Sequence, residues 1–222
     1  MKKFQPILAK AIKRAGGEAA FEDLLPTPAS NRKLKAMKDD RYLSIMSQRV
    51  FSAGLKHSMV EAKWPAFEEA FHAFDPRRVA NMPEDELEGL MQDRRLIRHW
   101  PKISSVPANA GAMLTIIGEA GSFGAWIADW PTTDIVGLWA EMGKRFKQLG
   151  GMSTPYFLRW VGKDTFVVTP DVAKGLMAAG VVDRKPSGKR DLAMVQEAFN
   201  AWAEETDRPL CQLSRALALS VG

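Results

Sequence analysis

The sequence contains very little cysteine and histidine. Among its 222 residues there is one cysteine, Cys211, and there are three histidines, His57, His72 and His99, which lie far apart. A single cysteine excludes a disulfide within the chain, and no cysteine–histidine group has the spacing of zinc ligands. We therefore expect no structural metal, no cofactor and a reducing, cytoplasmic setting.

Long apolar runs are also missing. A membrane helix needs about 18 to 20 consecutive apolar residues, and no stretch approaches that length. The apolar run near the N-terminus is interrupted at Lys10 before the core of a signal peptide could form. We expect no membrane span and no cleavable signal segment.

The excess of positive charge is small. Lysine and arginine total 31 residues against 26 acidic residues, a formal net charge of +5. Such a balance permits a nucleic-acid partner without requiring one. Apolar residues make up 46% and charged residues 26% of the chain, the composition of an ordinary globular protein.

Strand patterns are absent as well. No run of β-branched residues alternates for long enough to define a sheet. Apolar residues instead recur at helical spacing, which predicts an all-α fold with these stripes in its core. The stripes are Phe67, Phe71 and Phe74 in a helix opened by Trp64 and Pro65; Leu87, Leu90 and Met91 after Pro83; Leu192, Val195, Phe199 and Trp202; and Leu210, Leu213 and Leu217.

Residues 141–175 are the most informative segment. A basic stretch runs into a Gly-Gly pair, and a second amphipathic stretch follows. A Gly-Gly turn between two helices lets main-chain N–H groups approach a phosphate closely, because no side chain is in the way and the helix dipole favours an anion. The same pair is also an ordinary turn after a helix. The residues that we expect to hold a DNA backbone are Lys144, Arg145, Lys147, Gly150, Gly151, Ser153 and Thr154.

Several short motifs in the first half of the chain carry a family resemblance. They are Ala53-Gly54-Leu55, Phe71-His72-Ala73-Phe74-Asp75-Pro76, Val79-Ala80-Asn81-Met82, Leu90-Met91-Gln92-Asp93, Ile97-Arg98-His99-Trp100-Pro101-Lys102-Ile103 and Asn109-Ala110. In order and spacing they resemble the DNA-3-methyladenine glycosylase I family, part of the helix-hairpin-helix DNA glycosylase superfamily. The similarity covers about residues 45–112 and continues more loosely to about residue 176.

The resemblance implies an all-α, two-lobed helical fold with a pocket for a base flipped out of duplex DNA. We expect one glycosylase-like domain over residues 1–222, with the hairpin at about 141–162 and residues 1–40 as an N-terminal extension. The implied activity is base-excision repair of double-stranded DNA, in which the N-glycosidic bond of a damaged base, such as an alkylated purine, is hydrolysed. We expect a monomer, because one hairpin engages one stretch of duplex.

The chain departs from the family at the implied base pocket. Its members hold a zinc ion with two cysteines and two histidines, a set that this chain lacks. The family's pocket tryptophan and glutamate fall on His57 and Arg49. Phe51 lies in the turn where superfamily members push a side chain into the gap left by the flipped base, although a core role is equally open. The implied base pocket is thus Arg49, Phe51 and His57. A separate charged cluster, Arg98, His99 and Lys102, is interpreted as a solvated face or an internal brace.

A well-formed helix start follows the hairpin. Thr169 suits an N-cap, Pro170 the first helical position and Asp171 the first turn. The resemblance places the superfamily's catalytic aspartate at Thr169, with Asp171 two residues further on, so both are catalytic candidates. The lysine of lyase-type members falls near Pro155, so Schiff-base chemistry is not expected and the enzyme would be monofunctional.

These departures leave three interpretations. The protein is an active glycosylase with an altered pocket, a helix-hairpin-helix protein that binds DNA or senses lesions without catalysis, or a helical interaction protein on the same fold. An active enzyme needs an acid or its equivalent within reach of the sugar. The interaction protein would have no salt-dependent affinity for DNA.

Overall fold

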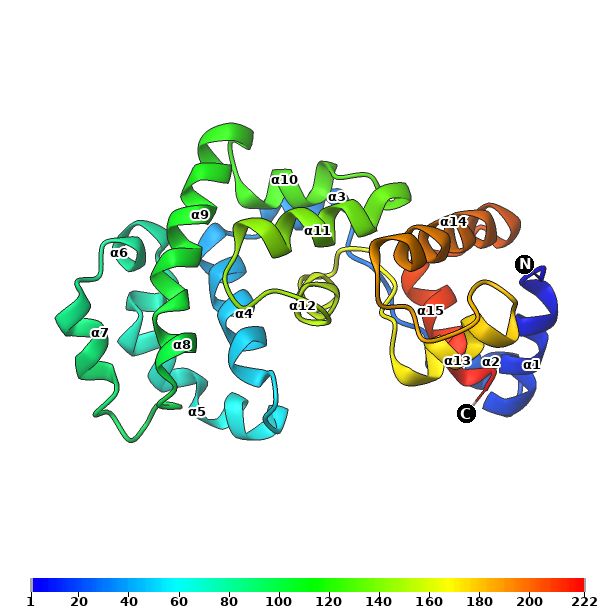
Figure 1. Cartoon of the computed structure of the whole chain (residues 1–222), viewed down its shortest axis with the longest axis horizontal. Coiled ribbons are helices and arrows are strands. Elements are labelled where there is room, and N and C mark those ends of the chain that lie inside the picture. The colour runs from blue at the N-terminus through cyan, green and yellow to red at the C-terminus, as the bar shows by residue number, and fades with distance from the viewer. Residues whose placement is uncertain (1, 222) are drawn as a thin grey trace. The chain divides into compact units, whose positions relative to one another are not determined.

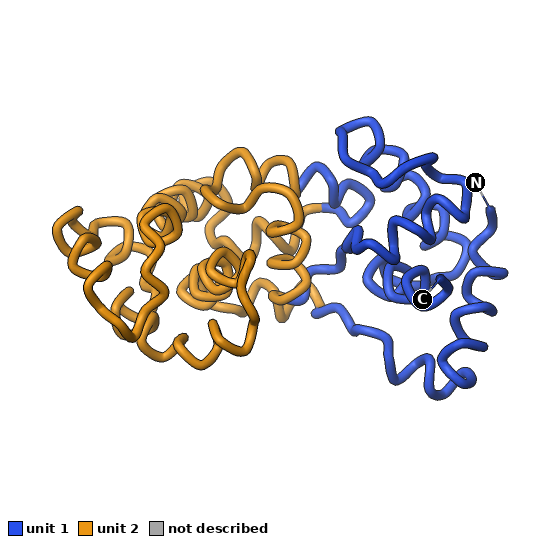
Figure 2. The backbone as a smooth tube through the Cα atoms, turned by 60° about the horizontal axis from the view of Figure 1, so that its bottom comes forward, with its two compact units in different colours: residues 1–29, 131–138, 162–222 blue, residues 30–130, 139–161 orange. Residues whose placement is uncertain are grey.

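The computed structural model describes residues 2–221, and within this range the chain is built of helices and loops without a strand (Figure 1). The all-α prediction is confirmed. The chain divides into two compact units, shown in different colours in Figure 2. Unit 1 consists of Met1–Ala29, Pro131–Leu138 and Gly162–Gly222, and unit 2 of Ser30–Trp130 and Trp139–Val161. The first 40 residues, expected as an N-terminal extension, therefore contribute to both units.

Helices of unit 1 come from both ends of the chain. They are α1 (Gln5–Ala15), α2 (Glu18–Asp23), the short 3₁₀ helix η2 (Thr132–Asp134), α13 (Pro170–Ala178), α14 (Lys189–Thr206) and α15 (Leu210–Leu219). Helices α1, α13 and α14 all pack on α15. In the two predicted C-terminal stripes Val195, Phe199, Trp202, Leu210, Leu213 and Leu217 are buried as predicted, whereas Leu192 is only partly buried.

Two long-range caps hold the helix ends of unit 1. The Glu205 carboxylate accepts hydrogen bonds from the main-chain N–H groups of Phe4 and Gln5 at the start of α1, at 2.9 to 3.1 Å. The Asp164 carboxylate accepts from Leu210 and Cys211 at the start of α15, at 3.0 and 2.9 Å. Each carboxylate satisfies N–H groups that have no partner within their own helix.

Unit 2 is built around α4. Its helices are α3 (Asn31–Ala36), α4 (Asp39–Ser52), α5 (His57–Ala70), η1 (His72–Phe74), α6 (Pro76–Ala80), α7 (Glu84–Leu90), α8 (Trp100–Ile103), α9 (Ser105–Ala120), α10 (Phe123–Asp129) and α12 (Ser153–Val161), while α11 (Ile135–Arg145) has residues in both units. Helix α4 packs against α5, η1, α9, α10 and α12. Helix α7 follows Pro83 as predicted, but only Leu87 of its predicted core stripe is buried, while Leu90 and Met91 are partly exposed.

The expected helix start at Trp64 and Pro65 is wrong. Helix α5 begins at His57 and contains Pro65 in its interior. Proline often marks a first helical turn, but here the helix continues through it, with Trp64 donating to the Ser44 hydroxyl of α4 at 3.0 Å. Phe74 lies beyond the end of α5, in η1, where three consecutive residues have positive φ. The Phe67, Phe71 and Phe74 stripe is nevertheless buried as predicted.

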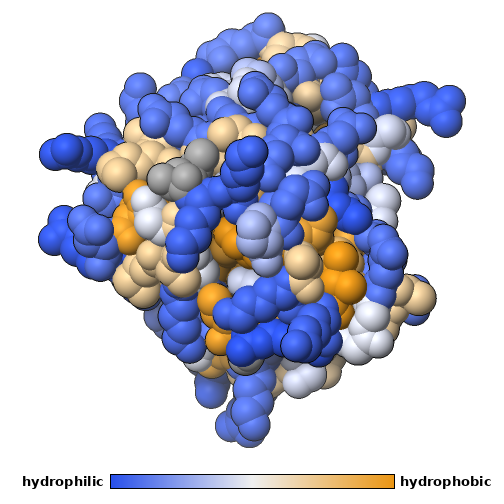
Figure 3. Space-filling model, turned by 90° about the vertical axis from the view of Figure 1, so that its right-hand side faces the viewer, coloured by the Kyte–Doolittle hydropathy of each residue, from blue (hydrophilic) through white to orange (hydrophobic). Residues whose placement is uncertain are grey.

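No single helix among residues 2–221 is long and apolar enough to cross a membrane. The segments Trp100–Ala120 and Phe123–Asp129 pass the length and composition test only as a pair, and the pair is bent by 69°. The side of the molecule seen in Figure 3 is mostly hydrophilic, with apolar side chains in small patches among charged ones.

Candidate functional site

The predicted hairpin is present in unit 2, between the last turn of α11 and the start of α12. Two buried polar side chains fix its turn. Asn109 accepts from the main-chain N–H of Lys147 at 2.7 Å and donates to the Lys147 carbonyl at 3.1 Å. The Thr154 hydroxyl donates to the Leu149 carbonyl at 2.5 Å. The turn is therefore fixed on its buried side by two side chains that are each 1% exposed.

The outer side of the turn is open. A Cβ atom placed on Gly150 or Gly151 would meet no heavy atom within 4 Å, and Gly151 has a φ of +58°. Within residues 2–221 the main-chain N–H groups of Gly151, Met152 and Thr154 have no hydrogen-bond acceptor. Unpaired donors at the start of a nine-residue helix suit an anion.

The main-chain N–H of Ser153 already donates to the Gly150 carbonyl at 3.2 Å, whereas that of Thr154 is available at this surface. Their side chains are 8% and 1% exposed, and the Thr154 hydroxyl is used within the turn. Main-chain and side-chain contacts of these two residues could not be distinguished from the sequence, because the distinction depends on burial.

The three basic residues before the turn differ in their surroundings. Arg145 is paired with Glu141 at 2.5 Å and with Glu119 at 2.9 Å, and these hydrogen bonds raise its pKa. Lys144 and Lys147 are exposed, and no ion pair within the described residues involves them. The two lysines, rather than Arg145, are thus available to an external phosphate.

Two of the predicted base-pocket residues lie together in unit 2, in contact with α12. The Arg49 guanidinium lies over the Tyr156 ring, 5.1 Å from its centroid, and 5.8 Å from the Trp160 centroid. The His57 and Trp160 ring centroids are 4.9 Å apart at 41°. We call Arg49, His57, Tyr156 and Trp160 the aromatic–basic cluster. Trp160 was expected in the core, yet it is 36% exposed.

The charge on Arg49 has no acidic partner among the described residues. Its Nε atom is buried without a hydrogen-bond partner, and burial lowers the pKa of Arg49, with a smaller opposing effect from Tyr156. Lys102 donates to the carbonyls of Phe51 and Ala53 at 3.1 and 2.7 Å, which favours the brace interpretation, since a cation suits a helix C-terminus. Burial, and then the Arg49 charge, lower the pKa of Lys102.

The wedge interpretation of Phe51 is wrong. Its side chain is fully buried, with the Phe67 and Trp64 ring centroids at 4.5 and 6.3 Å. Helical spacing turns Phe51 inward, so it cannot enter a base stack without leaving the core. Leu55, in the loop after α4, is 38% exposed and follows Gly54, whose φ is +81°. In the sequence, an apolar residue directly after a turn glycine is the signal that could have marked Leu55 as an exposed apolar side chain.

The two catalytic candidates lie in unit 1, at the start of α13. The Thr169 hydroxyl accepts from the Val172 N–H at 3.2 Å, the predicted N-cap. The Asp171 carboxylate is 3.0 Å from the Lys174 ammonium, and its side chain is 49% exposed. The structure thus gathers Arg49 and His57 in unit 2 and Thr169 and Asp171 in unit 1.

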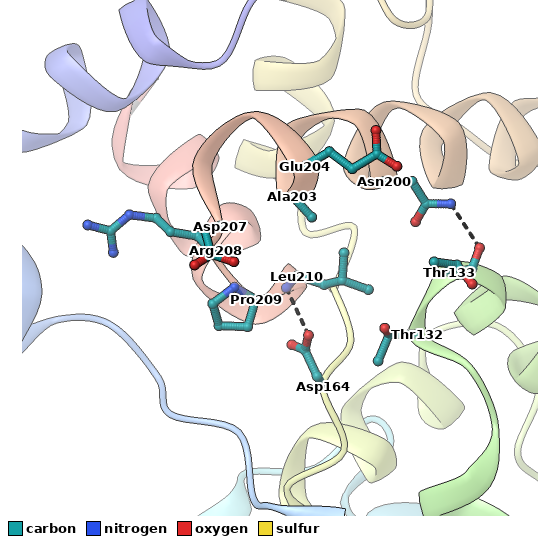
Figure 4. A pocket seen from close by; sticks show the side chains of 10 residues that line it. All are labelled: Thr132, Thr133, Asp164, Asn200, Ala203, Glu204, Asp207, Arg208, Pro209 and Leu210. Atoms are coloured by element: carbon teal, nitrogen blue, oxygen red, sulfur yellow. Dashed lines mark hydrogen bonds between the residues drawn. The ribbon is translucent and has the colours of Figure 1, made fainter.

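Unit 1 also contains an open hollow of about 390 Å³ (Figure 4). Its polar lining is largely engaged: Asp164 caps α15, and Asn200 donates to the Thr133 carbonyl at 2.9 Å. Glu204 and Asp207 add negative charge, which is unfavourable for a nucleic acid. Within residues 2–221 no group of three or more His, Cys, Asp or Glu side chains could hold a metal ion, and the residues present do not fit the zinc site implied by the family resemblance.

The all-helical fold and the hairpin define a class, the helix-hairpin-helix DNA glycosylase fold. The 8-oxoguanine DNA glycosylase of Methanocaldococcus jannaschii has this fold: the match covers 96% of this chain and 92% of that protein, with a TM-score of 0.58 and 12% identity. A structure of the same protein in complex with 15mer DNA containing 8-oxoguanine matches with a TM-score of 0.51 and 12% identity, over 98% of this chain and 90% of that one.

Residues 34–148 match the family model described as methyladenine glycosylase, and the chain belongs to this family. The DNA-3-methyladenine glycosylase of Haemophilus influenzae is 39% identical over 64 residues, which are 29% of this chain and 35% of that protein. DNA-3-methyladenine glycosylase 1 of Escherichia coli is 44% identical over 62 residues, 28% of this chain and 33% of that protein. The chain thus spans about a third of the length of these relatives.

Proposed function

We propose that this protein is a monofunctional DNA glycosylase of base-excision repair. It would flip a damaged base, in the simplest case an alkylated purine, out of duplex DNA and hydrolyse the N-glycosidic bond. Family membership supports the proposal. The observation that carries it is the hairpin, whose exposed glycines and unpaired N–H groups at the start of α12 suit a phosphate. We expect it to act in the cytoplasm. We also expect a monomer, because one hairpin engages one stretch of duplex.

In this proposal the hairpin grips the DNA backbone. The N–H groups of Gly151 and Thr154 donate to a phosphate, and the dipole of α12 favours the negative charge. Lys144 and Lys147 add affinity that does not depend on sequence and that weakens with salt. Leu55 is the apolar side chain that we assign to the gap left by the flipped base.

The flipped base would stack on the aromatic–basic cluster, where Trp160 and His57 offer exposed rings. As the bond between C1′ and the base nitrogen breaks, its electron pair leaves with the base and positive charge develops on the sugar. We assign the stabilisation of that charge, or the deprotonation of the attacking water, to Asp171, with Thr169 holding the helix start. Pro155 stands where a lyase would need lysine, so hydrolysis is the expected outcome.

One observation favours a second candidate, a protein that binds DNA or senses lesions without catalysis. The Asp171 carboxylate is half-exposed and paired with Lys174, the arrangement of a surface ion pair at a helix start. The hairpin does not depend on Asp171, so this candidate keeps the DNA grip and loses only the hydrolysis.

Single-turnover base release from duplexes that carry alkylated purines tests the proposal, alongside a salt titration of binding to undamaged and abasic duplex. Release above the uncatalysed background supports a glycosylase. Binding that falls steeply with salt, without release, supports the lesion-sensing candidate. If neither base release nor salt-dependent binding is observed, the DNA hypothesis fails and the interpretation as an interaction protein remains.

The hairpin can be tested with a matched pair of glycine variants. Gly151→Val should weaken duplex binding of every sequence by about 10-fold, because it blocks the phosphate from the N–H groups. Gly180→Val is the control, since Gly180 also has a positive φ, +71°, and open space around it, but ends α13 in unit 1. Equal affinity of the two variants would exclude the hairpin from DNA binding.

Asp171 can be tested in the same assay. Asp171→Asn should abolish single-turnover release while leaving duplex affinity unchanged, because the amide can neither stabilise the sugar cation nor accept the water proton. Asp183→Asn, at an exposed loop position, controls for the loss of one negative charge. Unchanged release by Asp171→Asn would leave Asp171 with a helix-stabilising role only.

A further inference from the structure

Arg49 differs from three other arginines whose side chains are partly shielded. Arg41 binds Glu68 through two nitrogens at 2.9 Å, Arg145 binds Glu119 and Glu141, and Arg208 binds Glu22. Within residues 2–221 no carboxylate pairs with Arg49, and only Tyr156 opposes the effect of burial on its pKa. A partly buried cation without a counter-charge is costly unless something else stabilises it.

The compensation that Arg49 receives is incomplete. Its guanidinium lies over the faces of Tyr156 and Trp160, which attract a cation through their π electrons. Its Nε–H still has no acceptor, although a guanidinium carries five N–H donors. Lys102 increases the positive potential, since its charge interacts with that of Arg49. The cluster therefore combines a positive charge that no carboxylate neutralises with exposed aromatic rings.

The charge of a damaged base decides how it interacts with such a cluster. A purine nucleoside alkylated at a ring nitrogen such as N7 carries a positive charge and leaves the sugar as a neutral base. An uncharged damaged base leaves with the electron pair of the C1′–N bond, as an anion, and then takes up the proton released when water adds to C1′. A fixed cation repels the first kind of base and stabilises the departure of the second.

We propose that Arg49 makes the aromatic–basic cluster select uncharged damaged bases with a carbonyl or ring-nitrogen acceptor, and discriminate against purines that alkylation has made cationic. This inference rests on the proposed function, and it narrows the substrate class within it. Arg49 donates a hydrogen bond to the base edge and stabilises the negative charge on the leaving base, while Trp160 and His57 stack on the base.

A pair of lesions that differ in charge but share an acceptor tests the proposal. Hypoxanthine and 7-methylguanine both have a carbonyl at C6, but only 7-methylguanine is cationic in the nucleoside. Single-turnover release and equilibrium binding are measured for duplexes with each lesion, and for undamaged duplex. The wild type should bind the hypoxanthine duplex more tightly than the 7-methylguanine duplex. After subtraction of spontaneous base loss, it should also accelerate the release of hypoxanthine more. Arg49→Glu should shift that preference toward 7-methylguanine by about 10-fold or more.

Three further variants separate charge from fold and geometry. Arg49→Lys should keep the direction of the preference with slower release, because it keeps the charge but loses the planar donors. Arg49→Gln removes the charge and should leave little or no preference between hypoxanthine and 7-methylguanine. Arg14→Gln, on the exposed side of α1 in unit 1, controls for net charge and should change nothing. Thermal unfolding of each variant checks that it is folded.

Several outcomes overturn the proposal. A wild type that favours 7-methylguanine, or a preference that Arg49→Glu does not move, removes Arg49 from base selection. Equal loss of affinity for all three duplexes, with a shallower salt dependence, makes Arg49 a phosphate contact instead. If the wild type releases no base at all, the proposed glycosylase function fails, but the ratio of the two lesion affinities and its response to Arg49→Glu still decide the selection.

Discussion

The two units of the chain are related to known glycosylases in different ways. The family match, residues 34–148, falls largely in unit 2, which also holds the hairpin turn and the aromatic–basic cluster. Most of unit 1 lies outside that match, while the fold match to the Methanocaldococcus jannaschii structure, at 12% identity, covers 96% of the chain and so includes both units. The family model thus covers mainly the helices of unit 2, whereas most of unit 1 is matched as an arrangement of helices.

The difference has a physical basis in how each unit is held together. In unit 2 a connected set of polar contacts joins α4 to α5. Arg41 binds the Glu68 carboxylate, and the Ser44 hydroxyl donates to the same carboxylate at 2.6 Å. The Ser44 hydroxyl in turn accepts a hydrogen bond from the Trp64 ring N–H. Few other side chains could replace this set without leaving a buried group unpaired. In unit 1 apolar stripes and single carboxylate caps, which many sequences can supply, occur beside polar pairs such as Arg208 with Glu22.

The largest expected effect tests the core of unit 2. Phe51→Ala should lower the free energy of unfolding by about 3–5 kcal/mol, because it leaves a cavity beside the Phe67 ring. Leu55→Ala is the matched control: it should cost little stability but weaken binding to abasic duplex if Leu55 is the wedge. Urea unfolding measures the first and duplex titration the second. A stable Phe51→Ala with impaired DNA binding would restore the wedge interpretation of Phe51.

A smaller effect is expected from the clamp beneath the hairpin. Asn109→Ala removes two hydrogen bonds to the main chain of Lys147 and should cost about 1–3 kcal/mol. Because the same bonds shape the turn, duplex affinity should fall as well. Asn81→Ala, which loses one exposed bond to the Arg77 carbonyl, should leave affinity unchanged. If Asn109→Ala loses stability but keeps full affinity, the clamp does not shape the DNA-binding surface.

Local sequence patterns predicted what local forces determine. The helix start at Thr169, the helix after Pro83 and the buried stripes of α14 and α15 follow from capping and from helical periodicity. The start of α5 was predicted wrongly because of Pro65. From the sequence alone, a proline in the first turn of a helix cannot be distinguished from a proline inside a helix, since the difference depends on the packing of the preceding turn.

Contacts between distant segments could not be predicted from those patterns. Asp164 caps a helix 46 residues away, and Glu205 caps one about 200 residues away. The cation–π contacts of Arg49 with Tyr156 and Trp160 likewise join α4 to α12. The family resemblance marked Arg49 as a departure, but only the packing of α12 shows that aromatic faces, rather than a carboxylate, compensate its charge.

The cap on α15 tests whether unit 1 can be weakened without touching DNA binding. Asp164→Ala should cost about 0.5–2 kcal/mol, because two N–H groups at the start of α15 lose their acceptor. Asp164→Asn keeps an acceptor oxygen and should recover part of that loss. Urea unfolding and duplex titration are run on both variants. Weaker duplex binding by folded Asp164→Ala would contradict the assignment of the DNA grip to unit 2 alone.

The smallest expected effect concerns the ion pair beside the hairpin in unit 2. The hydrogen bond from Arg145 lowers the pKa of Glu141 below its ordinary value of 4.5. A carboxyl with a lowered folded-state pKa stabilises the protein fully above its unfolded-state pKa, and that contribution is lost as the pH falls through the folded-state value. Since the pair is on the surface, Glu141→Gln should cost only about 0.3–0.5 kcal/mol at pH 7.

The pH dependence separates this pair from the charges that face DNA. The stability difference between wild type and Glu141→Gln should be constant from pH 7 to about pH 5 and then shrink toward zero at lower pH. Duplex affinity at pH 7 should stay the same or rise slightly, since the variant removes a negative charge near Lys144. A difference that grows as the pH falls would mean that the carboxylate of Glu141 destabilises the fold, and that Arg145 is available to a phosphate after all.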